Sequence, residues 1–238
     1  MWKIKSYSVS AISEMVKVGN NLIDVLLQRK ANKDKDVLIL VFTRKVTRLI
    51  EALCLLVRKD YTEESQILAR ALLEAKFAFD YVMQNKKEYD KIFQKFIDSL
   101  MLDKLKQIKA TNYEICPGKE TREFYSKIEA EIDSRYAHEE IVNLRRYGFT
   151  EMSIKNLADA TGNSKLYDLG YRFYSRNTHL TDGNEHLMQF IRSDQSISNY
   201  ENSRFKMILE VTFVCAQSVL KGVNNWLGEP IKLSEKGF

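Results

Sequence analysis

The chain has 238 residues, and only two prolines and nine glycines interrupt it. Both residue types break helices, so long stretches are left free to be helical. The net charge of +5 is a mild basic excess that permits an anionic partner such as RNA without requiring one. Three widely spaced cysteines make a disulfide framework improbable.

Apolar residues at helical spacing predict a series of helices along the chain. In chain order they are Ser8–Arg29, Val37–Arg58, Glu63–Gln84, Glu88–Lys109, Glu120–Tyr136, Ser153–Ala160, Ser164–His179 and Ser203–Trp226. No stretch shows sustained apolar and polar alternation, which makes a large sheet improbable. We therefore expect an all-α, single-domain bundle of about seven or eight helices over residues 1–228, followed by a flexible tail at 229–238.

Capping signals mark several helix boundaries. Thr62 precedes two glutamates and is the expected N-cap of the third helix. The stretch Ala137–Asn163 is less regular, and we expect a single short helix in it, begun by Ser153 and stopped by Gly162.

The chain shows no signal for export and one segment that invites comparison with a membrane span. Met1–Lys5 lacks the apolar core of a signal peptide, so a cytoplasmic location is expected. The segment Val37–Val57 is rich in Leu, Ile and Val but carries four charged residues, Arg44, Lys45, Arg48 and Glu51. Such charges are costly in hydrocarbon, so we interpret the segment as a buried helix of a bundle and expect no membrane partner.

The third predicted helix carries ionisable residues on a largely apolar wheel. Arg70, Glu74 and Tyr81 form a polar patch between apolar residues, whereas Lys76 and Asp80 fall elsewhere and look like an ordinary surface pair. Two interpretations of the patch stay open. Arg70 and Glu74 satisfy each other at the edge of the core, or they line a ligand-binding cleft with Tyr81.

The helix Ser164–His179 has two predicted faces. The inward face holds Leu166, Leu169, Gly170, Phe173 and Tyr174, and the outward face holds Asp168, Arg172, Ser175, Arg176 and His179. A histidine can act as general acid or base on RNA while an arginine holds the phosphate, and Ser175 is one turn from His179 and can orient it. The other interpretation is a solvated polar face without chemistry.

Known ligand and nucleotide motifs are absent. His179 and His186, with Asp182 and Glu185 nearby, do not match a recognised metal-ligand spacing, so no metal site and no cofactor are expected. The chain also contains neither a glycine-rich phosphate loop nor a Gly-x-Ser-x-Gly nucleophile motif.

Two segments taken together resemble a widespread bacterial family of helical domains of unknown function. The first is Ala69–Glu74, with its Arg-x-x-x-Glu spacing; the second begins at Tyr147-Gly148 and ends in the Ser-x-x-x-His motif at Ser175–His179. The similarity spans about Val37–Asn184, and the chain departs from it at Tyr147, where tryptophan is expected. The resemblance implies that Arg70, Glu74, Ser175 and His179 converge on one site, and it names no reaction.

A looser similarity links the chain to HEPN domains, small helical bundles found in toxins and phage-defence ribonucleases. Their motif is an Arg followed by His after four to six residues, and Arg172 precedes His179 with six residues between them. Phe173 departs from the motif, in which a polar residue commonly follows the Arg; Arg176 and Asn177 supply a polar pair one turn later.

Two hypotheses follow. The first is a metal-independent, HEPN-like endoribonuclease of a bacterial or phage-related defence or toxin system, acting on RNA as a homodimer. His179 is then the acid or base, and Arg172 or Arg176 holds the phosphate. The second is a non-catalytic helical sensor or interaction subunit, in which Arg70, Glu74 and His179 bind a small ligand or a partner protein.

Overall fold

The computed structural model describes residues 8–29, 33–111, 119–177 and 194–228. Within these ranges, side chains are described except at 33–35, 119–121, 176–177 and 194–203. The described ranges contain helices and no strand, which confirms the predicted all-α, single-domain architecture. The predicted tail at 229–238 lies outside the described residues.

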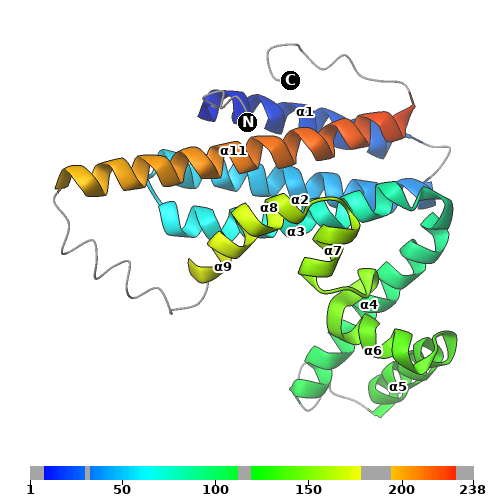
Figure 1. Cartoon of the computed structure of the whole chain (residues 1–238). Helices are drawn as coiled ribbons and strands as arrows, with labels where there is room; N and C mark the ends of the chain where they lie inside the picture. The colour runs from blue at the N-terminus through cyan, green and yellow to red at the C-terminus, as the bar shows by residue number, and fades with distance from the viewer. Residues whose placement is uncertain (1–7, 30–32, 112–118, 178–193, 229–238) are drawn as a thin grey trace.

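Four long helices lie side by side and form the bundle (Figure 1). They are α1 (Val9–Gln28), α2 (Lys33–Arg58), α3 (Thr62–Gln84) and α11 (Asp194–Leu227). Each contacts at least two of the others, and α3 and α11 run in the same direction along the bundle.

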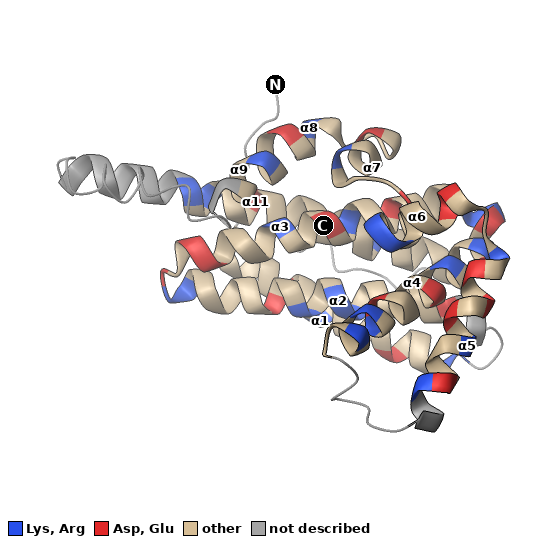
Figure 2. Ribbon diagram, turned by 90° about the horizontal axis from the view of Figure 1, so that it is seen from below, with Lys and Arg blue, Asp and Glu red and all other residues tan. Residues whose placement is uncertain are grey.

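A second group of helices extends from the end of α3. It comprises α4 (Tyr89–Ala110), α5 (Lys119–Arg135) and α6 (His138–Tyr147), with short 3-10 turns at Lys86–Glu88 and Gly148–Thr150. Basic and acidic residues alternate over these helices (Figure 2). Several pair across them, as in the bond from Lys109 to Glu129 and the two bonds from Arg135 to the buried Asp98. The same three helices share a small buried apolar cluster, made up of Leu102, Leu105, Ile132, Ile141 and Leu144.

A third group of short helices packs on α3. The first is α7 (Ile154–Ala160), and a continuous helical segment over residues 164–177 follows. That segment begins as α8 (Ser164–Leu166), passes through a π-helical turn at Tyr167–Tyr171 and continues as α9 (Arg172–Asn177). Both α7 and α9 contact α3, so the segment with the predicted arginine and serine motifs lies against the helix that carries Arg70 and Glu74.

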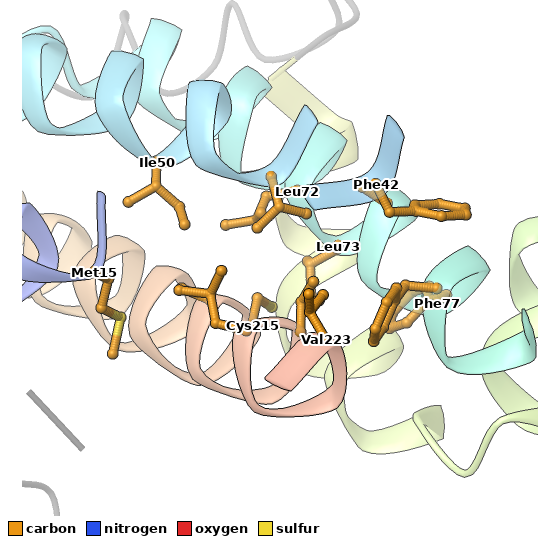
Figure 3. Close-up of a cluster of buried hydrophobic side chains, with 14 of the residues drawn as sticks. Met15, Phe42, Ile50, Leu72, Leu73, Phe77, Cys215 and Val223 are labelled. Atoms are coloured by element: carbon orange, nitrogen blue, oxygen red, sulfur yellow. The ribbon is translucent and has the colours of Figure 1, made fainter. Parts of the chain in front are cut away.

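The main hydrophobic core lies between α1, α2, α3 and α11. Figure 3 shows side chains from all four helices meeting there, including Met15, Ile50, Leu72 and Val223, each of which is fully buried. Cys215 also lies in this core, and burial raises the pKa of its thiol to about 12. The core therefore contains a protonated, chemically inert thiol.

One close helix contact depends on a glycine. A Cβ atom on Gly222 of α11 would lie 2.6 Å from Cε1 of Phe79 on α3, well inside van der Waals distance. The absence of a side chain at this position lets the Phe79 ring pack against the α11 backbone.

The structure confirms several predicted boundaries and corrects others. Ser153 caps α7, its hydroxyl accepting a bond from the Asn156 amide at 3.3 Å, and Gly162 ends that region with a positive φ of 74°. Thr62 is not the N-cap of α3, because the helix begins with Thr62 itself and Tyr61 precedes it. The helix α6 was missed, because no side chain of Ala137 caps it; the Glu140 carboxylate accepts from the Ala137 amide instead.

The last helix is longer than predicted, and its C-terminal part is apolar enough to be compared with a membrane-spanning helix. By length and composition alone, Arg204–Leu227 could cross a membrane, the only such segment in the described ranges. Because 56% of the apolar stretch in this segment is buried inside the bundle, the segment also has the character of a core helix.

Candidate functional site

Arg70, Glu74 and Tyr171 form a triangle of polar contacts where α3 meets the π turn. Arg70 Nε donates to Glu74 Oε1 at 3.2 Å, and Arg70 Nη2 donates to the Tyr171 hydroxyl at 3.0 Å. The Tyr171 hydroxyl in turn donates to Glu74 Oε1 at 3.0 Å. The predicted Arg70–Glu74 pair is therefore present, and a tyrosine 101 residues from Arg70 completes it.

The three groups differ in burial, which sets their electrostatics. Tyr171 is buried, whereas the side chains of Arg70 and Glu74 are 26% and 38% exposed. Burial raises the pKa of Tyr171, and the Glu74 charge raises it further. Burial opposes the charge on Arg70, but Tyr171 and Glu74 outweigh that effect and raise its pKa. The guanidinium also lies over the Tyr171 ring, 4.9 Å from its centroid.

Ser175 lies one helical turn after Tyr171 on the same segment. Its hydroxyl donates to the Tyr171 backbone carbonyl at 2.7 Å. The structure brings Arg70 and Glu74 together at the Tyr171 hydroxyl. The convergence of Arg70, Glu74, Ser175 and His179 that the family resemblance implies stays a prediction, because His179 lies outside the described residues.

The π turn changes which residues of this segment face inward. Both Gly170 and Tyr171 are buried, although they are consecutive, and Leu169 is 73% exposed. The predicted inward position of Leu169 is therefore wrong, because an uninterrupted α-helical wheel does not allow for the extra residue of a π turn. Ser175 is half-buried and does not share the solvent-facing side with Arg172.

Arg172 lies on the outer face of the segment. Its side chain is 66% exposed, and its contact with Asp168 is a long one of 3.5 Å. The predicted outward positions of Arg172 and Asp168 are confirmed. The guanidinium is accessible to a ligand from solution.

Three predicted residues fall outside this description. His179 and His186 lie outside the described residues, and the side chain of Arg176 is not described although its backbone belongs to α9. Within the described ranges, no three His, Cys, Asp or Glu side chains gather as metal ligands would.

Tyr81 belongs to a different cluster from Arg70 and Glu74. It lies about 10 Å along the α3 axis from Glu74, and its ring packs edge-on against Phe149 at 6.5 Å. Burial raises the pKa of Tyr81. The nearby Lys95 is buried, bonds Glu151 and Glu140, and lies over the Tyr136 ring. Tyr81 therefore packs at the junction of α3 with the second group of helices.

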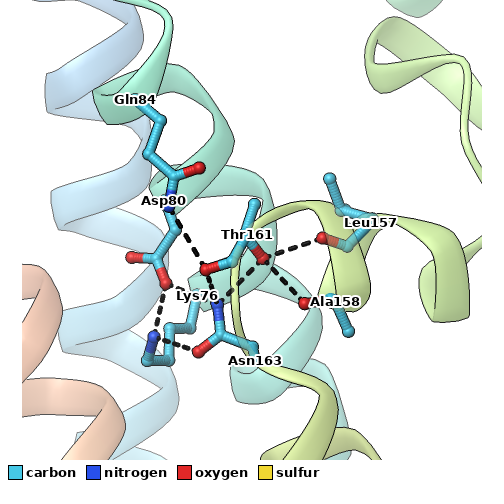
Figure 4. Close-up of polar contacts among 7 residues, drawn as sticks. All are labelled: Lys76, Asp80, Gln84, Leu157, Ala158, Thr161 and Asn163. Atoms are coloured by element: carbon cyan, nitrogen blue, oxygen red, sulfur yellow. Dashed lines mark hydrogen bonds and ion pairs between the residues drawn. The ribbon is translucent and has the colours of Figure 1, made fainter.

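A second polar cluster joins α3 to the loop before α8 (Figure 4). Lys76 Nζ donates to Asp80 Oδ2 at 2.5 Å and to Asn163 Oδ1 at 2.9 Å. Asn163 Nδ2 donates to Asp80 Oδ2 at 2.8 Å, and the Gln84 amide donates to the Thr161 carbonyl at 3.2 Å. The predicted pairing of Lys76 with Asp80 is confirmed, but its predicted surface location is wrong, because the Lys76 side chain is only 6% exposed beneath the Thr161–Asn163 loop.

The sequence analysis missed the residues that complete both clusters, Tyr171 and Asn163. Each had a local signal. Asn163 follows Gly162 at the start of a predicted helix, a position that favours Asn, and Tyr171 is an aromatic residue with a polar tip next to the predicted inward face. Their partners on α3 lie 83 or more residues away, so no local pattern identifies the pairing.

The comparisons with known proteins bear on the family alone. No curated protein and no solved structure shows significant similarity to the chain. The model of DUF5677, a family of unknown function, matches residues 36–197, which include the whole of α3, the π turn and the Ser-x-x-x-His motif. The match covers more than half of the chain, so this protein belongs to the DUF5677 family.

Proposed function

We propose that this protein is a metal-independent endoribonuclease of the HEPN-like kind, acting in a bacterial or phage-related defence or toxin system. The proposed catalytic groups are His179 as general acid or base and Arg172 as the phosphate ligand, with Arg176 as a second cation. Arg70, Glu74 and Tyr171 hold the helical segment that carries Arg172 and Arg176 against α3.

The observation that carries this proposal is the contrast between two consecutive residues. Tyr171 is buried and bonded to α3, while Arg172 is 66% exposed. An arginine that projects to solvent from a firmly held helix is suited to bind a phosphate. The donors of its guanidinium match the phosphate oxygens, and the helix backbone that carries it is fixed in place. The mild positive charge of the chain is compatible with an anionic substrate.

The chemistry assigned to these groups is acid–base catalysis with electrostatic stabilisation. His179 accepts the proton of the attacking hydroxyl or gives one to the leaving oxygen, a contribution of about 10²–10⁴-fold in rate. Arg172 offsets the negative charge that develops on the phosphate in the transition state.

The arginine assignments are tested with end-labelled RNA in the presence of EDTA. Arg172→Ala and Arg176→Ala should each slow cleavage, the larger loss marking the phosphate ligand. The matched control is Lys165→Ala, an exposed cation on the same segment, which should cleave at a rate close to that of the wild type. Equal rates for Arg172→Ala and Lys165→Ala would remove Arg172 from the catalytic site.

A second candidate function rests on the partial exposure of the Arg70–Glu74 pair. A half-open ion pair beside a buried tyrosine can hold a small polar ligand or a partner segment. Under this alternative the wild type cleaves no RNA, and Arg70→Ala and His179→Ala weaken binding of the same partner. Cleavage by the wild type that His179→Ala abolishes would reject it.

We also propose that the protein is a homodimer. The helix α2 exposes apolar side chains, with Val41 at 40% and Leu55 at 59%, whereas the described side chains of α11 include no exposed large apolar residue. Val41→Glu should therefore shift the mass measured by light scattering from dimer to monomer at micromolar concentration. A monomer mass for the wild type would contradict this proposal.

A further inference from the structure

The π turn at Tyr167–Tyr171 lies between two points at which the same helical segment is fastened to α3. At the first point, Asn163 bonds Lys76 and Asp80; at the second, the Tyr171 hydroxyl bonds Arg70 and Glu74. We infer that these two clamps hold the π turn in place, and that Tyr171 is a positioning residue whose hydroxyl fixes the direction in which Arg172 points. The role of Tyr171 in catalysis rests on the proposed function. Its role in holding the π turn and directing Arg172 does not depend on that function.

The spacing of the two clamps explains why the turn is π-helical. In an α-helix each residue advances by about 100°, so positions eight apart differ in direction by about 80°, whereas positions seven apart agree within about 20°. Asn163 and Tyr171 are eight apart. In the π turn the Arg172 amide bonds the Tyr167 carbonyl, five residues back, so the turn absorbs one extra residue. The two clamps are thereby brought to the spacing of seven α-helical residues.

The first clamp is firm because its groups are buried and satisfy one another. Asn163 is 8% exposed, and its side chain bonds Lys76, Asp80 and Thr161 at once. The Asn163 carbonyl also accepts the amide of Tyr167, the first residue of the π turn. The start of the turn is therefore fixed relative to α3.

The second clamp holds the end of the turn close to α3. A Cβ atom on Gly170 would lie 3.1 Å from Cδ1 of Leu73, so the backbone of the turn rests almost directly on α3. The Tyr167 and Tyr171 rings stack at 5.1 Å on the same side. In addition to this packing, the Tyr171 hydroxyl accepts a hydrogen bond from Arg70 and donates one to Glu74. These two bonds fix Tyr171, and no adjacent residue of the segment, at this position on α3.

When the second clamp is released, the π turn can convert to an ordinary α-helical turn, in which each amide bonds the carbonyl four residues back. All residues after the turn then rotate by about 100° relative to α3. Arg172 moves from the exposed position to the half-buried position now held by Phe173, and Phe173 moves to the buried position now held by Tyr174. The exchange keeps an aromatic ring in the core, so the rotated helix remains compatible with the fold.

The inference is tested by the distance between two nitroxide labels, at Asp24→Cys, an exposed position of α1, and at Arg172→Cys, in a Cys116→Ser background. Tyr171→Phe removes the clamping hydroxyl and keeps the ring, and it should shift or split the distance distribution. The matched control is Tyr174→Phe, because the Tyr174 hydroxyl is buried and bonds no described residue. This control should leave the distribution unchanged. Glu74→Gln, which weakens the same clamp from α3, should resemble Tyr171→Phe.

Deletion of Leu169 should make the direction of the residue 172 label independent of the Tyr171 hydroxyl. Leu169 is 73% exposed, so its loss costs little packing and removes the extra residue. The shortened segment fits both clamps as a regular α-helix, and Tyr171→Phe should no longer move the label in this background. Distances that do not change in Tyr171→Phe, or that change equally in Tyr174→Phe, would overturn the inference whether or not the protein cleaves RNA.

The RNA assay separates this inference from the proposed function. In the unlabelled protein, Tyr171→Phe should lower the cleavage rate by at least about 10²-fold with little change in KM, because even a misplacement of a catalytic group by about 1 Å costs about that much and the rotation moves Arg172 further. Label distances that behave as expected in a protein without ribonuclease activity would reject the proposed function alone. Cleavage that depends on Arg172 but not on Tyr171 would reject the positioning role alone.

Discussion

Lys76 Nζ on α3 lies 2.9 Å from Asn163 Oδ1, across 87 residues of sequence. The same ammonium group is 2.5 Å from Asp80 Oδ2, and the Lys76 side chain is only 6% exposed. A charge so deeply buried is tolerated because both of its partners lie within hydrogen-bond distance. The contact ties the loop before α8 to the central helix of the bundle.

Loss of Lys76 should destabilise the fold strongly. Lys76→Ala leaves Asp80 without its counterion and Asn163 without a donor, and breaking such a buried pair costs about 3–5 kcal/mol. The measurement is the free energy of unfolding in urea. Lys17→Ala is the matched control, since Lys17 and Glu14 form an exposed pair worth about 0–1 kcal/mol. Similar losses for the two variants would show that Lys76 is not buried.

Loss of Glu74 should cost less than loss of Lys76. The Glu74 side chain is 38% exposed, so solvent screens its pair with Arg70. Glu74→Ala removes one acceptor from Arg70 and one from Tyr171, and we expect a loss of about 1–2 kcal/mol in the free energy of unfolding. A thermal melt identical to that of the wild type would mean that the triangle does not form in solution.

Gly222→Ala should destabilise the bundle even though alanine favours helices by about 1 kcal/mol over glycine. The new methyl group meets Phe79 at 2.6 Å, and overpacking of this kind costs about 1–3 kcal/mol. Urea unfolding measures the net effect. Phe79→Leu in the same chain should recover part of the loss by removing the clashing ring atoms; a double variant no more stable than Gly222→Ala would point to another cause.

Stability should fall in acid through Glu129. The hydrogen bond from Lys109 and the bonds from Arg145 lower the pKa of Glu129 below its unfolded value of about 4.3. A depressed folded pKa adds stability that is fully present above the unfolded pKa and is lost as the pH falls through the folded pKa. Glu129→Gln should therefore be less stable than the wild type at pH 7 and approach it below about pH 4.

The matched control for this pH dependence is Glu139→Gln. Glu139 is exposed on α6 and forms no ion pair with another described residue. Its replacement should leave the pH profile of unfolding unchanged. A gap between wild type and Glu129→Gln that stays constant from pH 7 to pH 3 would rule out the Lys109–Glu129–Arg145 group as its source.

The fold was predictable because helical periodicity is a local property. The apolar stripes of α1, α3 and α7 gave their extents within one residue, and Ser153 gave a cap that the structure confirms. The prediction failed where tertiary contacts decide. The helix α6 lacks a side-chain cap on Ala137, and the π turn depends on clamps from α3 that no local pattern contains.

The candidate site was predictable in part for the same reason. The Arg70–Glu74 pair follows from a spacing of four on one helix. The burial of Lys76 did not follow, because the loop at Thr161–Asn163 that covers it comes from a distant part of the chain. Tyr81 shares the wheel position of Arg70 but lies about three turns away along the axis, a separation that a wheel does not display.

The most direct test of the proposed function is the single-turnover rate of RNA cleavage in EDTA by the wild type, His179→Ala and the matched control His138→Ala. His138 is an exposed residue of α6, far in sequence from the proposed catalytic groups. The account predicts that the wild type and His138→Ala cleave at similar rates, and that His179→Ala is slower by about 10²–10⁴-fold with an unchanged melting temperature. RNA left intact by the wild type, or cleavage by folded His179→Ala at the wild-type rate, would contradict it.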